Sequence, residues 1–95
     1  MPKFVIERTL PGAGKLSADE VRAIAAKSNS VLQGMNDGGI PIVWHESHVT
    51  EDKIYCVYTA PSEEAVREHA TQGGFPADSV ARVSHTIDPT SADRA

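Results

Sequence analysis

The chain has little of several features that would identify a function directly. One cysteine among 95 residues excludes an internal disulfide and the paired thiols of redox motifs. Nine basic residues against 13 acidic ones give a net charge of −4, which argues against nucleic acid as a partner. No apolar run is long enough to span a membrane, and the first residues lack the apolar segment of a signal peptide. We therefore expect a cytoplasmic protein with no membrane partner.

Motifs for nucleotide binding and for well-known hydrolytic mechanisms are also missing. The segment LPGAGKLS, residues 10–17, resembles a phosphate-binding loop, but Leu16 follows Gly14-Lys15 and no glycine stands five positions before Gly14. The spacing that such a loop needs is therefore absent, and we expect no nucleotide cofactor. The chain shows neither a Ser-His-Asp arrangement nor the metal-protease motif H-E-x-x-H.

Alternating and helical spacings of apolar residues predict six elements in the order strand, helix, strand, strand, helix, strand. Ser17 and Glu20 have the spacing of a capping box at the start of the first helix, and Gly34 is a predicted C-cap. With right-handed crossovers, this order predicts an α+β fold, the ferredoxin-like βαββαβ sandwich, whose four-stranded antiparallel sheet has both helices on one face. The predicted strands are 3–8, 42–49, 54–60 and 80–87, the helices are 17–33 and 62–72, the domain is 1–89, and the flexible polar tail is 90–95.

The second face of this sheet predicts self-association. Neighbouring residues on a strand point to opposite faces, so Val5 and Val57 cannot share the helix-covered face with Ile6 and Cys56. Both faces therefore carry apolar side chains, although helices cover only one of them. We expect a homodimer packed sheet to sheet, as in dimeric α+β barrels.

The segment VWHESH, residues 43–48, contains the first candidate metal ligands. On a regular strand Glu46 and His48 share a face, whereas His45 and His48 point to opposite faces unless a bulge intervenes. Imidazole nitrogen and carboxylate oxygen together suit nickel, zinc and similar divalent ions. Two ligands do not complete a site, and the alternative is an exposed edge strand that simply carries polar residues.

His69 is the second candidate, because it lies on the apolar face of the second predicted helix. It shares that face with Ala65, Val66 and Ala70, so its side chain should point toward the sheet. An inward histidine can be a metal ligand or a general base, or it can simply be hydrogen-bonded within the core.

The amino-acid sequence also resembles that of a known family. The segments MPKFVIER, KLSADEVRAIAAKSN and GGFPAD, and above all residues 55–70, are similar to a small bacterial family of ferredoxin-like proteins long labelled a domain of unknown function. The better-described type of that family is a nickel-binding homodimer. The resemblance covers Pro2 to Pro89 and implies the fold, the dimer and nickel as the favoured ion.

Three functional hypotheses follow. The leading one is a homodimeric metal-binding protein without established catalysis, with Glu46, His48 and His69 as ligands and His45 serving a second ion or none. The second is a small-molecule enzyme of the oxygenase or isomerase type, with His69 as acid or base and a pocket lined by Trp44, Tyr58 and Phe75. A cavity beside His69 would favour this second hypothesis, and a solid core would count against it. The third is a structural or regulatory interaction module, with neither cavity nor metal.

Overall fold

Four antiparallel strands form one sheet, in the spatial order β2-β3-β1-β4. The structure is a computed structural model that describes residues 1–93. The strands are β1 (Lys3–Thr9), β2 (Val43–Val49), β3 (Lys53–Thr59) and β4 (Ser79–Arg82), the helices are α1 (Ala18–Asp37) and α2 (Glu63–Gly73), and two short 3-10 helices are η1 (Ala13–Lys15) and η2 (Pro89–Asp93).

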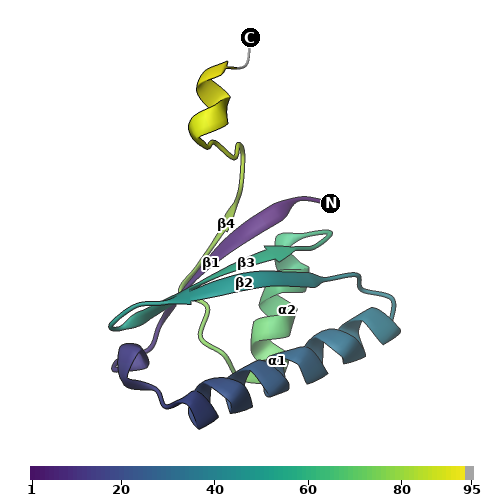
Figure 1. Cartoon of the computed structure of the whole chain (residues 1–95). Coiled ribbons are helices and arrows are strands. Elements are labelled where there is room, and N and C mark those ends of the chain that lie inside the picture. The colour runs from purple at the N-terminus through teal and green to yellow at the C-terminus, as the bar shows by residue number, and fades with distance from the viewer. Residues whose placement is uncertain (94–95) are drawn as a thin grey trace.

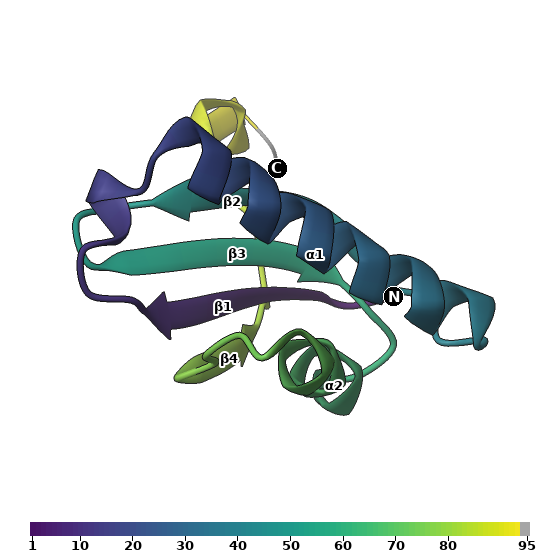
Figure 2. The ribbon, with the colours of Figure 1, turned by 90° about the horizontal axis from the view of Figure 1, so that it is seen from below.

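Both helices lie on the same face of the sheet, and the other face is open (Figure 1). Seen from the helix side, α1 runs along β2 and β3, and α2 lies beside β1 and β4 (Figure 2). The predicted ferredoxin-like fold is confirmed. Within residues 1–93, no helix combines the length and the apolar character that crossing a membrane requires.

The first helix begins where the sequence predicts and ends later. Ser17 is the N-cap: its hydroxyl accepts a hydrogen bond from the Glu20 backbone N–H at 3.1 Å, and its own N–H donates to Glu20 Oε1 at 3.0 Å. The predicted stop at Gly34 is wrong, because the helix continues to Asp37 and Gly38 is the C-cap. The additional turn buries Met35 in the core, and this packing outweighs the low helix propensity of glycine.

The last strand is shorter than predicted. Residues 80–87 have a strand pattern, but β4 ends at Arg82, which pairs with Phe4 near the start of β1. One further hydrogen bond joins the Val83 N–H to the Lys3 carbonyl at 2.8 Å. Beyond that point β1 offers no partner, so the ladder stops for lack of a neighbouring strand.

The segment after β4 leaves the body of the domain on the side away from the helices (Figure 1). It carries Ile87, which is 82% exposed, and it ends in η2. The predicted flexible tail, residues 90–95, is described only as far as Asp93, and its remaining residues, 94–95, lie outside the described part of the chain. The flexibility of the tail stays a prediction.

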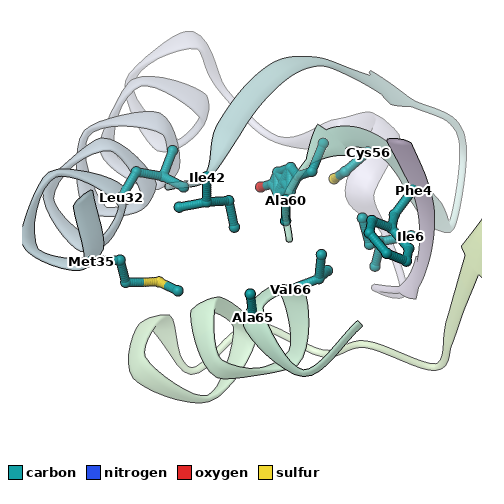
Figure 3. Packing of buried hydrophobic residues seen from close by; sticks show 10 residues of the cluster. Phe4, Ile6, Leu32, Met35, Ile42, Cys56, Ala60, Ala65 and Val66 are labelled. Atoms are coloured by element: carbon teal, nitrogen blue, oxygen red, sulfur yellow. The ribbon is translucent and has the colours of Figure 1, made fainter. Parts of the chain in front are cut away.

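The hydrophobic core fills one end of the space between the helices and the sheet. Figure 3 shows Leu32 and Met35 of α1 facing Ala65 and Val66 of α2, with side chains of the sheet beside them. The residues that α1 buries, Ser28, Leu32 and Met35, all lie in its second half. Its first half, by contrast, is half-buried or exposed, so the helix is packed tightly at one end only.

Two helical glycines allow a test of this packing. A Cβ added at Gly73 would overlap the ring of Phe75, whereas one added at Gly34 would meet no atom within 4 Å. We expect Gly73→Ala to lower the free energy of unfolding by about 1–3 kcal/mol through overpacking. The matched control Gly34→Ala should instead raise it by up to about 1 kcal/mol, because alanine favours the helix.

Urea unfolding followed by circular dichroism measures both changes. Equal effects of the two substitutions would contradict the close approach of Gly73 to Phe75.

Candidate functional site

A β-bulge in β2 decides which way its side chains point. Trp44 pairs with Tyr58 and Glu46 pairs with Val57, so His45 is an extra residue without a direct partner in β3. Such a bulge reverses the alternation of side chains downstream of it. Ser47 therefore lies on the helix-covered face together with Trp44, although the two are three positions apart, and the Trp44 indole N–H donates to the Ser47 hydroxyl at 2.9 Å.

Glu46 and His48 share a face, as predicted, and the bulge makes it the open face. They pair with Val57 and Tyr55 of β3, whose side chains point away from the helices. His48 Nε2 is 2.8 Å from Glu46 Oε2, and the two side chains are 65% and 59% exposed. The pair is thus preformed and open to solvent, with one nitrogen and one oxygen donor side by side.

His45 lies on the same face, which corrects the expectation from regular alternation. Its Nε2 shares a hydrogen bond of 2.5 Å with the hydroxyl of Thr59, a residue that points to the open face like Val57. The bulge is the physical reason, since it lets two successive residues turn toward one side. His45 and His48 therefore do not point to opposite faces, but His45 is engaged with β3 and not with the Glu46–His48 pair.

His69 points inward, as predicted, and is fully buried on the other side of the sheet. Its Nε2 shares a hydrogen bond of 3.1 Å with the Ser28 hydroxyl of α1, and its Nδ1 has no partner among the described residues. Its ring contacts Tyr58 edge-on, with centroids 5.0 Å apart, and is tilted against Phe75 at 5.5 Å. Burial, together with the positive charge of Arg8, lowers the pKa of His69 to about 4, so the imidazole is neutral near pH 7.

One copy of the chain therefore does not bring the four predicted ligands together. The sheet separates His69 from His45, Glu46 and His48. Among residues 1–93, no three His, Cys, Asp or Glu side chains are grouped as a metal site would require.

A cavity of about 340 Å³ lies between the first half of α1 and the sheet. All three residues predicted to line a pocket, Trp44, Tyr58 and Phe75, contribute to its wall. His69 does not line the cavity; it lies behind the wall, in contact with Tyr58 and Phe75. Most of the wall is apolar, with Val21, Ile24 and Ala25 from α1, Val49 and Ile54 from the sheet, and Leu10 and Leu16 from the segment between β1 and α1.

Sequence reasoning missed Arg8, which also lines the cavity and is only 5% exposed. Its Nε donates to Cys56 Sγ at 3.4 Å and its Nη1 donates to the Pro76 carbonyl, while Nη2 has no hydrogen-bond partner among the described residues. A signal was available in KFVIER, because Arg8 alternates with Phe4 and Ile6 and so had to share their buried face.

Tyr58 connects these groups. Burial raises the pKa of its phenol, an effect that outweighs the opposite influences of Ser28 and Arg8, so the hydroxyl stays protonated at neutral pH. Together with Arg8 and the Ser28–His69 pair, it forms a small polar cluster at the boundary between the filled core and the cavity.

The buried His69 predicts how stability depends on pH. In the unfolded chain the histidine has an ordinary pKa near 6.5, and in the folded protein the pKa is about 4. The unfolded state therefore takes up the proton first, and stability that is complete above pH 6.5 is lost as the pH falls toward 4. We expect a loss on the order of 3 kcal/mol.

Urea unfolding at several pH values, compared with His69→Gln, isolates this contribution. If the free energy of unfolding of His69→Gln fell with pH as steeply as that of the wild type, His69 would not be the cause of the pH dependence.

Comparisons with known proteins agree with this fold. A family model described as "Nickel responsive protein SCO4226-like" matches residues 4–83. The crystal structure of SCO4226 from Streptomyces coelicolor A3(2) matches with a TM-score of 0.73 at 19% identity, over 90% of this chain and 99% of that chain, a likeness that supports the fold alone. No curated protein matches the sequence. Since the family model covers most of the chain, the protein belongs to the family of SCO4226-like nickel-responsive proteins.

Proposed function

We propose that the protein is a homodimer that binds nickel or another divalent transition metal at the open face of its sheet, without catalysis of its own. The observation that carries this proposal is the exposed Glu46–His48 pair, with donor atoms 2.8 Å apart. The name of the family, which refers to nickel, supports the choice of ion. The expected cytoplasmic location stays a prediction.

The donor set of the pair suits such an ion. Imidazole nitrogen binds nickel, copper and zinc well, and a carboxylate adds negative charge at little geometric cost. Both side chains are attached to one strand two positions apart, so the sheet holds them on the same face. A metal ion can replace the hydrogen bond between them without any movement of the backbone.

A second copy of the chain supplies the ligands that one copy lacks. In a two-fold symmetric interface the same surface meets itself, so any group near the axis appears twice. Two Glu46–His48 pairs provide four donors, which is the usual number for a closed transition-metal site. His45 is close enough in sequence to contribute to the same region, whereas His69, behind the sheet, is not part of this proposal.

The open face itself favours the dimer. Val5, Tyr55 and Val57 are half-buried on this face although no other described element covers it, and Val43 is 47% exposed. The arm after β4 projects on the same side with Ile87 exposed (Figure 1). A partner packed on the sheet would cover these side chains, which a domain of this size could use for stability.

The cavity supports the second hypothesis in part. A well-formed cavity beside His69 is what small-molecule binding requires and what a pure interaction module does not need. His69 itself does not line that cavity, and its low pKa leaves it a weak base. The structure thus offers a place for a ligand, but the histidine expected to transfer a proton does not face it.

Calorimetric titration of tag-free protein with nickel tests the metal site. We expect one ion per two chains, and an affinity reduced at least about tenfold in His48→Gln and in Glu46→Gln, because each removes a ligand. His69→Gln is the matched control and should bind as the wild type does. Undiminished binding in both ligand variants would refute the proposed site, and loss in the control alone would place the metal on the other side of the sheet.

Analytical ultracentrifugation tests the dimer. Val57→Glu places a carboxylate in the middle of the open face, where a partner would bury it at a cost of several kcal/mol, on the order known for unpaired buried charges. This variant should sediment as a monomer. Val21→Glu makes the same change on α1, at the far side of the molecule, and should leave the dimer intact. A wild type that is monomeric at all concentrations would contradict the proposal.

A further inference from the structure

We propose that the cavity beneath α1 binds a small carboxylate with an apolar body, and that Arg8 holds the carboxylate group. This site lies on the helix side of the sheet, away from Glu46 and His48, and is independent of the proposed metal site. Two features point to such a ligand: the charge of Arg8, which has no ion pair among residues 1–93, and the mostly apolar wall of the cavity.

Arg8 is a buried cation without an anionic partner. It is 5% exposed and forms no ion pair among residues 1–93. Its contacts are the thiol of Cys56, the carbonyl of Pro76 and the ring of Phe75, whose centroid lies 5.7 Å from the guanidinium carbon. The protonated phenol of Tyr58 also interacts with it. All of these partners are neutral, and one nitrogen, Nη2, has no hydrogen-bond partner within residues 1–93.

Asp78 is the acidic residue whose pKa responds to Arg8, and it does not neutralise the charge. Its carboxylate accepts a hydrogen bond from the Thr9 backbone N–H. Hydrogen bonding to Thr9 is the main cause that lowers the pKa of Asp78, and the influence of Arg8 is the smallest of the causes. Asp78 is exposed and forms no ion pair with Arg8.

An unpaired charge in a protein interior is costly, and a bound anion removes that cost. A guanidinium recognises a carboxylate well because its parallel N–H groups match the two carboxylate oxygens. Nη2 is shielded from solvent in the free protein. A carboxylate in the cavity would therefore reach it only after a small change in side-chain rotamer, of the kind that is common on ligand binding.

The remaining wall sets the nature of the ligand's body. The other polar side chains of the wall are occupied: the Ser28 hydroxyl pairs with His69, and the Ser47 hydroxyl accepts from Trp44. The Cys56 thiol accepts from Arg8, and the Tyr58 phenol interacts with Ser28 and Arg8. The body of the ligand therefore meets aliphatic and aromatic surface. A volume of about 340 Å³ is at the small end of ligand pockets and suits a single ring or a branched chain.

Trp44 provides the measurement, since it is the one tryptophan of the chain and lines the cavity. Its fluorescence is followed while the protein is titrated with phenylacetate, benzoate or 4-methylpentanoate, and with the corresponding neutral amides. We expect saturable binding of at least one acid, with its amide at least about tenfold weaker, the difference expected for hydrogen bonds to a charged group.

Two variants assign the binding to Arg8 and to the cavity. Arg8→Met keeps the length and apolar character of the side chain and removes the charge, so it should weaken the acid at least tenfold and leave the amide unchanged. Ala25→Phe fills the cavity from α1 and should abolish both. The double variant Glu46→Gln, His48→Gln is the control and should bind the acid as the wild type does, whether or not the metal proposal holds.

Several outcomes would overturn the proposed carboxylate site. Failure of all three acids to bind wild-type protein overturns it, as does equal affinity for acid and amide, or undiminished binding of the acid by Ala25→Phe. If Arg8→Met does not fold, the comparison of acid with amide on the wild type still tests the role of the charge. Loss of acid binding in the open-face control would also refute it, by locating the ligand at the wrong side of the sheet.

Discussion

The bulge at His45 is the constraint on which both candidate sites depend. Without it, strict alternation in β2 would place Trp44 and Ser47 on opposite faces, and the indole N–H would lose its partner. The extra residue keeps Trp44 and Ser47 above the cavity and Glu46 and His48 on the open face. One irregular position thus divides the polar side chains of a seven-residue strand between two surfaces with different chemistry.

The helix side of the sheet has a second constraint, the charge of Arg8. Arg8 and His69 are both buried and basic, and two positive charges in one small interior would repel each other strongly. Burial and the charge of Arg8 act in the same direction on His69, lowering its pKa so that it stays neutral. The hydrogen bond with Ser28 then uses one nitrogen of the neutral ring. The histidine therefore fits a structural role, and the arginine is the charged member of the cluster, without an ion pair among residues 1–93.

Local sequence signals predicted the framework well. The capping box at Ser17 and Glu20 marks the start of α1, and the second helix, predicted from residue 62, begins after the N-cap Ser62. Both signals depend only on residues within one turn. Signals that depend on a distant neighbour failed. Gly34 did not stop α1 because Met35 packs into the core, and the strand pattern of residues 80–87 was not realised beyond Arg82 because β1 begins at Lys3.

For the sites, the sequence by itself determined the residue types, the inward direction of His69 and the shared face of Glu46 and His48. It also contained the position of Arg8 within an apolar alternation. Only the tertiary structure decided that a bulge brings His45 to the open face and that the sheet separates His69 from Glu46 and His48. It also decided that Arg8 has no anionic partner in the described part of the chain. The physical reason is that periodicity specifies the direction of a side chain relative to its own element, whereas distances between elements and the pairing of buried charges arise only when the elements pack together.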